Sequence, residues 1–600
     1  MIHFCHLDKL RKKIHITDHE HTSLDIHLIN KQLKIYRGKW KAQKKKCFEL
    51  RMKFLEDHAA LLAEKMRTTD AKALHAIKRA EESKCTFCTI KQILGKQRTQ
   101  LTDIDVPSSP MDMGFSTTTI SNKQDVEYHL IHRNKCHSRQ SLSTPFFQSP
   151  TLQQAIDPHH ANNSINDLLQ GTFQHSRVRD YKLNDTEKKF LESLKTIVTT
   201  DVPLHLSLED FRQYFKSKQE GTASSPSGRH MGHYRAMLEC LHHNTPTLPS
   251  IILNIAMISL QTATPLHRWQ QASQLMLEKG KGKHIDNLRI IQLCEADLNF
   301  ILHVVRGKRL IRHASHHLDK AQFAIPGQTC HNAVISKQLY LDLSQQTFST
   351  GLMIDYNAKA VFDRVISGIA NLACRRFGLP KIAGDFMHNL LFHMTFHLVT
   401  GFSKSAATFS NADDLPNIGQ GVLQGSSSAC PIYILNSDIC LQSYRRCSVS
   451  TWFIHPIKGT YISDHVVQFV DDTTQFINAL GTIPHQNAQA SDTSEHSLFT
   501  CAQKNVSDWN DLIWFSGGKL QPQKCYYYSF IPWYNFKKLA MSYTNYANME
   551  PLYLHDHDTN NRITLEHRSP DDTRRTLGVI LAPNGSASKQ LQHTTQLAKE

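Results

Sequence analysis

Apolar and polar positions are spaced in ways that predict both helices and short strands along the chain. Ser207 opens a capped helix that runs to about Lys218, and apolar segments with helical spacing follow near 250–278 and 296–314. The run Gly351–Ile354 is instead typical of a short strand. Because these elements do not alternate at the regular spacing of βαβ units, the pattern predicts an α+β fold.

Residues 1–110 are predicted to form a basic helical arm. Apolar residues recur there in steps of four and three, as a packed amphipathic helix requires: Met52, Leu55, Ala59, Leu62 and Met66. Residues 31–98 hold 19 Lys and Arg against 7 Asp and Glu, so this segment carries +12 of the formal charge of +16. A basic arm on a nearly neutral body indicates a polyanionic partner such as nucleic acid, although a solvated helix face explains the same charges.

Residues 111–183 are predicted to be a linker, because they are rich in Ser, Thr, Pro and Gln and show no clear periodicity. With 600 residues the whole chain is expected to form about three or four structural units. The longest apolar stretch, Ile251–Leu260, is too short to span a membrane, and the N-terminus lacks the apolar core of a secretory signal. The 14 scattered cysteines fit reduced thiols, so we expect an intracellular protein.

An acidic pair, Asp471 and Asp472, lies between two apolar runs of strand character, Val466–Val470 and Thr473–Ile477. Two like charges at the tip of a hairpin repel each other unless a divalent cation lies between them. An acidic turn between two surface strands is the simpler alternative. The local sequence leaves the two interpretations open.

Further motifs precede and follow this pair in a fixed order. They are Asp355–Asp363, the Gly- and Ser-rich Gly419–Pro431 that leads into an apolar helix, Gly518–Cys525 and Arg575–Ile580. Their order resembles the palm of reverse transcriptases, specifically those of non-LTR-like retrotransposons, over residues 209–581. The resemblance implies a right-hand polymerase, with helical fingers at 184–345, an antiparallel palm sheet packed on helices at 346–581, and the start of a truncated thumb at 582–600.

The resemblance also implies an activity and its partners. A reverse transcriptase is an RNA-directed DNA polymerase that extends a DNA primer on an RNA template with deoxynucleoside triphosphates. Nucleotidyl transfer to the primer 3′-hydroxyl uses two Mg²⁺ ions, or Mn²⁺, about 4 Å apart. In Phe469–Asp472 the family pattern makes Asp471 the main metal ligand and Asp472 its support, with Asp355 as a candidate third ligand.

Other residues match positions that handle the nucleotide. Arg289 falls where the family contacts the triphosphate, and a planar, permanently charged guanidinium suits phosphate oxygens. Phe362 falls at the aromatic gate beneath the sugar, although a core phenylalanine is an equally good interpretation. Gln424 and Gly425 match the pair that positions nucleotide and template. Lys524 matches a candidate general acid for pyrophosphate release, or is an ordinary exposed lysine.

The basic and Gly-rich segments of the fingers are weaker matches. Lys279, Lys281 and Lys283 resemble a fingers motif, but singly they are better explained as a lysine-rich surface loop. The turn Ser225–Tyr234 resembles the one that opens the fingers.

One position departs from the family pattern. Counting back from Phe362, the metal-binding aspartate of the first palm motif is replaced by Asn357, whose neutral carbonyl oxygen cannot bridge two cations. Asp355, two residues earlier, is about 6.6 Å away along a strand. A catalytically dead relic that only binds nucleic acid is therefore the alternative to an active polymerase. A group II intron-like or telomerase-like polymerase shares the palm and stays open as well.

Overall fold

The computed structural model describes residues 101–107, 117–157, 163–218, 226–229, 231–239, 248–278, 282–410, 421–454, 461–463, 466–478, 495–535, 540–544, 551–584 and 586–599, together with five single positions between 34 and 53. Arg98–Glu600 form one compact unit, and Met1–Gln97 form another. The predicted basic arm lies almost wholly outside the described residues. Its five described positions are helical and exposed.

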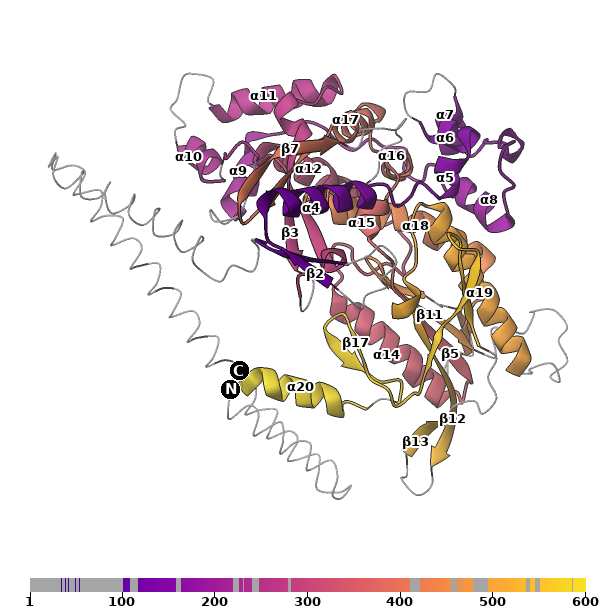
Figure 1. The fold of residues 1–600 in the computed structure, drawn as a ribbon. Coiled ribbons are helices and arrows are strands. Elements are labelled where there is room, and N and C mark those ends of the chain that lie inside the picture. Colours follow the sequence, from indigo (N-terminus) through magenta and orange to yellow (C-terminus); the bar gives the residue numbers. More distant parts are fainter. Residues whose placement is uncertain are drawn as a thin grey trace. The chain divides into compact units, whose positions relative to one another are not determined.

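A mixed sheet of six strands forms the centre of the larger unit (Figure 1). Its order is β10-β11-β5-β12-β13, and β16 pairs in parallel with β12. The strands are β5 (Gly351–Tyr356), β10 (Val466–Phe469), β11 (Asp472–Asn478), β12 (Tyr526–Asn535), β13 (Ala540–Thr544) and β16 (Glu566–Arg568). β5 runs antiparallel to both β11 and β12. Helices and two strand pairs lie between β5 and β10 in the chain, and a long helix lies between β11 and β12. The predicted α+β class is confirmed, and so is the predicted strand at 351–354.

Helices cover both faces of this sheet. Side chains of β5 alternate between them: Leu352 and Ile354 join the largest hydrophobic cluster, while Met353 joins a smaller one. The first face packs on α15 (Val361–Arg364), α16 (Ser367–Arg375), α18 (Ala429–Cys447) and α19 (Glu495–Phe515). The second face packs on α14 (Cys330–Gln346). Figure 1 shows α14 and α19 on opposite sides of β5 and β11.

A second sheet has the order β4-β3-β6-β7. It consists of β3 (Gln271–Glu278), β4 (Leu288–Leu293), β6 (Thr395–Thr400) and β7 (Ser403–Ser410). The helix expected near 250–278 is therefore only half right, since α11 (Leu248–Gln261) ends and β3 follows. Alternating burial along β3 and β4 shows a strand period that the apolar composition concealed. The expected helical fingers thus contain strands, and they pair with a hairpin from the expected palm range.

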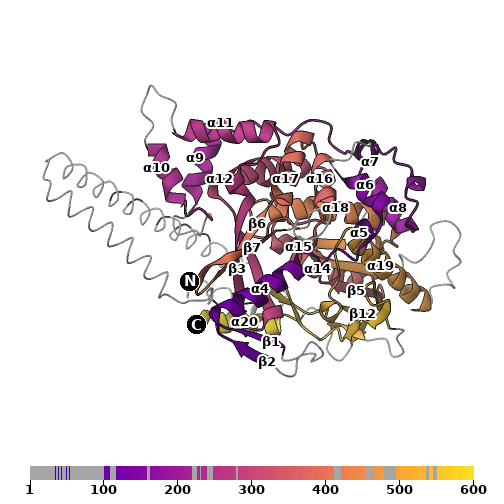
Figure 2. The same ribbon diagram turned by 45° about the horizontal axis from the view of Figure 1, so that its top comes forward.

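The expected linker at 111–183 is wrong over most of its described length. It contains β2 (Thr117–Ile120), α4 (Lys123–His137), α5 (Pro145–Gln148), α6 (Pro150–Ile156), α7 (Ser164–Gln170) and a 3₁₀ turn (His175–Arg177). Phe146, Leu152 and Leu168 are fully buried in the main core, and α4 lies against β6 and β7 (Figure 2). These helices are short, so few apolar residues anchor each one and no long periodicity marks them. β1 (Ile104–Pro107) pairs with β2, which places it with this unit.

The remaining helices follow the expected pattern more closely. α8 (Asp185–Glu192) begins where order was expected to return, and α9 (Leu208–Ser217) has the predicted cap, in which Ser207 accepts from the backbone of Asp210. The helix predicted at 296–314 is confirmed as a continuous run. It comprises α12 (Ala296–Leu302), a π-helical turn η4 (His303–Leu310) and α13 (Ile311–Ala314). Two more helices are α10 (Met231–Glu239) and α17 (Lys381–Phe392).

The C-terminal part adds small hairpins and one helix. They are β14 (Tyr553–Asp556), β15 (Asn561–Thr564), β17 (Arg574–Thr576), β18 (Val579–Leu581) and α20 (Ser588–Lys599), besides the hairpin of β8 (Trp452–Ile454) and β9 (Tyr461–Ser463). α20 occupies the range expected to begin a thumb. None of the helices in the described ranges combines the length and apolarity needed to cross a bilayer. The nine described cysteines are all free thiols.

Candidate active site

The acidic pair lies at the tip of the β10–β11 hairpin, as predicted. Phe469 pairs with Asp472, so the turn has only two residues, Val470 and Asp471. Val470 adopts a left-handed φ of 61°, which a β-branched residue rarely accepts. The neighbouring loop holds the hairpin, because the backbone of Gln468 bonds to Ala321 and Phe323. The turn is therefore fixed in a strained conformation by its surroundings.

Asp472 shares a face of the sheet with Asp355. Thr474 is the direct cross-strand partner of Asp355, and Asp472 lies two residues before Thr474 on the same strand. Burial raises the pKa of Asp472, and the charge of Asp355 raises it further, whereas Lys337 lowers it. The structure thus brings together two of the predicted ligands, Asp355 and Asp472.

A lysine already occupies the space beside these carboxylates. Lys337 reaches from α14, its side chain is only 5% exposed, and its Nζ lies 3.3 Å from Oδ1 of Asp355. The hydroxyl of Thr474 donates to the same Oδ1. Asp355 also contributes to the raised pKa of Tyr526, after burial. The carboxylate of Asp355 is therefore already bound by side chains of the protein.

The charge of Asp471 affects the pKa values of a different set of side chains. After burial, its charge is the largest cause of the raised pKa values of Tyr433 and Cys430, which lie at the start of α18. The ring of Phe362 contacts Tyr433 edge-on, with 5.7 Å between ring centres. The predicted sugar gate is thus connected to the predicted main metal ligand through one tyrosine.

Asn357 follows β5 directly. The pairing of β5 with β11 ends one residue earlier, at Tyr356 and Thr473. The backbone N–H of Asn357 donates to Sγ of Cys525 at 3.3 Å, and its carbonyl accepts from Gln521 at 2.8 Å. The backbone of Asn357 is therefore held by Gln521 and Cys525, and its side chain is neutral.

The segment 421–425 connects the gate residue to the second sheet. The backbone N–H of Val422 donates to the carbonyl of Phe362 at 3.0 Å, and the N–H of Gln292 donates to the carbonyl of Gln424 at 2.6 Å. Gly425 has a φ of +120°, and a Cβ there would lie 2.5 Å from the carbonyl oxygen of Gln292. Only glycine fits this close approach without displacing β4.

The predicted cations of the site are spread out. Arg289 is exposed on β4, on the face opposite its buried neighbours Leu288 and Ile290. Lys283 pairs with Asp103 at 2.5 Å, while Lys279 and Lys281 lie outside the described residues. Lys524 is exposed at the end of a 3₁₀ turn (Pro522–Lys524), two residues before β12 begins.

Sequence reasoning missed the groups that surround Asp355. Lys337 lies on the buried stripe of α14 with Ala333, Val334, Tyr340 and Leu341, so a lone lysine in an apolar helix face was the available signal. A second missed group is the ring of Tyr526, which stacks with two guanidinium groups, Arg568 at 5.0 Å and Arg574 at 5.3 Å.

These residues do not fit a pair of divalent cations. Two-metal catalysis requires carboxylates from two strands to converge on shared ions. Within the described ranges, no group of three or more His, Cys, Asp or Glu side chains lies close enough to hold a metal ion. The ammonium of Lys337 supplies the positive charge that Asp355 and Asp472 would otherwise require from a metal.

The comparisons with known proteins add no assignment. The chain matches no protein-family model, and a search of curated proteins finds no significant match.

Proposed function

We propose that this chain is a retroelement-derived protein with the fold of a reverse transcriptase, which binds an RNA template and a DNA primer without extending the primer. Three features support the fold. The central sheet places the strand of the first palm motif, β5, between the acidic hairpin and β12. A long helix follows the Gly- and Ser-rich segment. The segment containing Gln424 and Gly425 lies between the gate residue and β4.

The loss of polymerase activity rests on one observation. Lys337 pairs with Asp355 beside Asp472, while the residue that follows β5 is the neutral Asn357. A buried ammonium beside two carboxylates compensates their charge. A divalent ion would have to displace Lys337 from a site where it is almost fully enclosed.

Primer extension on poly(rA)/oligo(dT) with Mg²⁺ or Mn²⁺ tests this proposal. The natural chain is expected to bind the duplex but to incorporate no deoxynucleotide. Asn357→Asp combined with Lys337→Met is expected to recover incorporation, because it restores one carboxylate and removes the competing cation. The matched control is Asn357→Asp with Asp472→Asn, which restores one carboxylate and removes another. Incorporation by the natural chain, or no binding of the duplex, contradicts the proposal.

An active polymerase is the second candidate, and one observation favours it. Asp355 and Asp472 share a face and are close enough for the charge of one to raise the pKa of the other. If Asp355 takes the role of the missing aspartate, the natural chain incorporates deoxynucleotides, and Asp355→Asn abolishes incorporation while leaving duplex binding intact. Loss of both activity and binding in Asp355→Asn indicates misfolding instead, which a melting curve reveals.

A further inference from the structure

A hollow of about 570 Å³ lies outside the candidate active site, between α9, the loop before it and the helix of η4 and α13. Its lining is strongly basic. The residues are Val198, Thr200, Pro203, Asp210, Lys308, Arg309, Arg312, His313, His316 and His317. Asp210 is the one carboxylate among them, against three permanent cations.

The cations differ in how they are held. Arg309 is fixed, because it donates to the carbonyls of Pro203 and His205 and pairs with Asp210 at 2.7 Å. Asp210 is thereby neutralised. Arg312 is exposed, and Lys308 donates to the neutral side chain of Gln213. Among the described residues, no ion pair involves Lys308 or Arg312. The hollow therefore keeps two uncompensated positive charges.

A second basic hollow, of about 380 Å³, continues along the same chain segment. Residues 192–197 line it, and the next residues, 198–203, line the first. Lys195, Arg376, Arg445 and Arg446 contribute its cations, against the carboxylates of Glu192 and Asp319. The two hollows thus follow one another along a single stretch of backbone, which the N–H groups of Ile197 and Val198 fasten to the carbonyl of Arg376.

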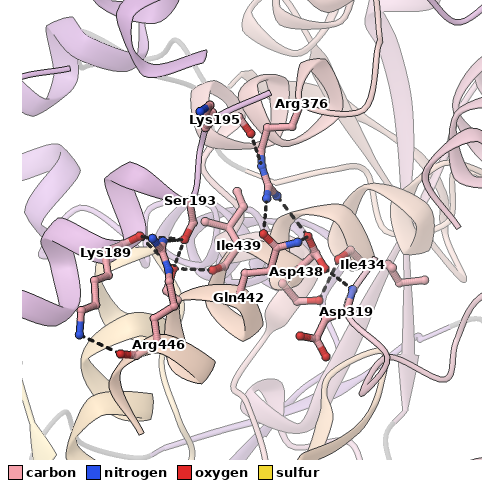
Figure 3. Close-up of polar contacts among 12 residues, drawn as sticks. Lys189, Ser193, Lys195, Asp319, Arg376, Ile434, Asp438, Ile439, Gln442 and Arg446 are labelled. Atoms are coloured by element: carbon pink, nitrogen blue, oxygen red, sulfur yellow. Dashed lines mark hydrogen bonds and ion pairs between the residues drawn. The ribbon is translucent and has the colours of Figure 1, made fainter. Parts of the chain in front are cut away.

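Hydrogen bonds hold the cations of the second hollow in place (Figure 3). Arg376 donates to Asp438 at 3.2 Å, to Gln442 at 2.9 Å and to the carbonyl of Lys195. Arg446 donates to the carbonyl of Lys189 at 2.6 Å and to the hydroxyl of Ser193. Arg376 is fully buried in its ion pair with Asp438, and Arg445 and Arg446 pair with Asp319 and Glu192. Among the described residues, the exposed Lys195 is therefore the cation of this hollow for which no ion pair is found.

We propose that the two hollows form one track that binds the phosphate backbone of a single nucleic-acid strand, separate from the acidic hairpin. The proposal rests on the proposed function, because it assumes that the protein binds nucleic acid. Several cations in sequence along a concave surface suit a chain of phosphates better than one small anion. No Phe, Tyr or Trp lines either hollow, and binding is expected to depend on phosphate contacts more than on base sequence.

Salt-dependent binding of a fluorescein-labelled 20-nucleotide oligo(U) to the full chain tests the track. Lys308→Glu with Arg312→Glu is expected to weaken binding roughly tenfold or more at low salt and to reduce the slope of log affinity against log salt by about 1.4. The matched control, Lys381→Glu with Lys589→Glu, makes the same charge change at exposed positions outside the track.

The outcomes separate the two proposals. If the natural chain does not bind the oligonucleotide or a primer–template, the proposed function fails. If it binds, but the track variant keeps the affinity and slope of the control, only the track is overturned. The milder variant Lys308→Gln with Arg312→Gln controls for misfolding of the glutamate variant. It removes the same two positive charges without adding negative ones, so the affinity and the salt slope are expected to fall in the same direction by a smaller amount. An unchanged slope in this variant also overturns the track.

Discussion

At the scale of single residues, Lys337 is the side chain that most changes the interpretation of the candidate active site. Its ammonium is nearly enclosed and lies beside two carboxylates that the sequence assigned to a metal. Burying a charge is costly unless a partner of opposite sign is present, so the lysine and Asp355 depend on each other. The pair explains how two carboxylates remain close together in the described structure.

Removing Lys337 alone is expected to destabilise the fold. Lys337→Met leaves Asp355 and Asp472 without their counter-charge, and we expect the free energy of unfolding in urea to fall by roughly 3–5 kcal/mol. Lys337→Met combined with Asp355→Asn removes both charges and is expected to recover most of that loss. A single variant within about 0.5 kcal/mol of the natural chain means that the ion pair contributes nothing.

A glycine is the second residue with a specific requirement. Gly425→Ala combines a strained φ with a Cβ that would lie 2.5 Å from the carbonyl oxygen of Gln292. Gly327→Ala is the matched control, because Gly327 also has a positive φ, +87°, but nothing lies within 4 Å of its Cβ position. The control is expected to lose about 1–2 kcal/mol and Gly425→Ala distinctly more. Equal losses contradict the close approach.

The sequence predicted the acidic hairpin because its signal is local: two apolar runs and the turn lie within about a dozen residues. It could not predict what Asp355 contacts. The partners of that carboxylate come from α14 and β11, and Thr474 is 119 positions away in the chain. A lysine side chain is ordinarily exposed, so only the packing of α14 against the sheet reveals its burial.

At the scale of elements, the short helices between 123 and 170 changed the picture most. A polar composition suggested a linker, yet Phe146 of α5 is fully buried and its ring centre lies 4.8 Å from that of Phe515 in α19. Each short helix has only a few buried apolar residues, so the sequence shows no helical periodicity there, although these residues pack in the main core. The fold class was predictable from the mixture of patterns, whereas the pairing of β3 with β6 was not, because it joins strands more than 100 residues apart.

Phe146→Ala tests whether this region is integral to the core. Truncating a fully buried phenylalanine is expected to cost roughly 3–5 kcal/mol of unfolding free energy. Tyr128→Ala serves as the control, since Tyr128 lies on α4 in the same region and is 68% exposed. Thermal or urea unfolding of both variants measures the difference. If Phe146→Ala behaves like the control, the region is a linker after all.

At the scale of the whole molecule, the 37 histidines give stability a dependence on pH. Burial lowers the pKa values of three of them, His303, His397 and His567. The unfolded state therefore binds more protons than the folded state as the pH falls below about 6.5. Above that pH the three histidines are neutral in both states and do not reduce the free energy of unfolding. On acidification the unfolded state takes up protons that the folded state does not, and the free energy of unfolding falls. Asp438 acts in the opposite direction, because burial raises its pKa to about 6.

The melting temperature between pH 7.5 and 5.5 tests this dependence. The natural chain is expected to melt at a lower temperature at pH 5.5, because the unfolded state then protonates the three histidines; the raised pKa values of Asp438, Asp472 and Glu187 reduce this decrease. The triple variant His303→Gln, His397→Gln and His567→Gln is expected to lose less of its melting temperature over the same range. An equal decrease in both proteins excludes these histidines as the cause.

The position of β5 has a consequence for how the protein is made. β5 lies between β11 and β12, which the ribosome synthesises more than 100 residues later. At about 5–20 residues per second, the apolar segment around Leu352 and Ile354 waits roughly 10–30 seconds for its partners. During that interval both of its backbone edges are open to any extended peptide. The segment is therefore open to edge-to-edge pairing until β11 and β12 have been made.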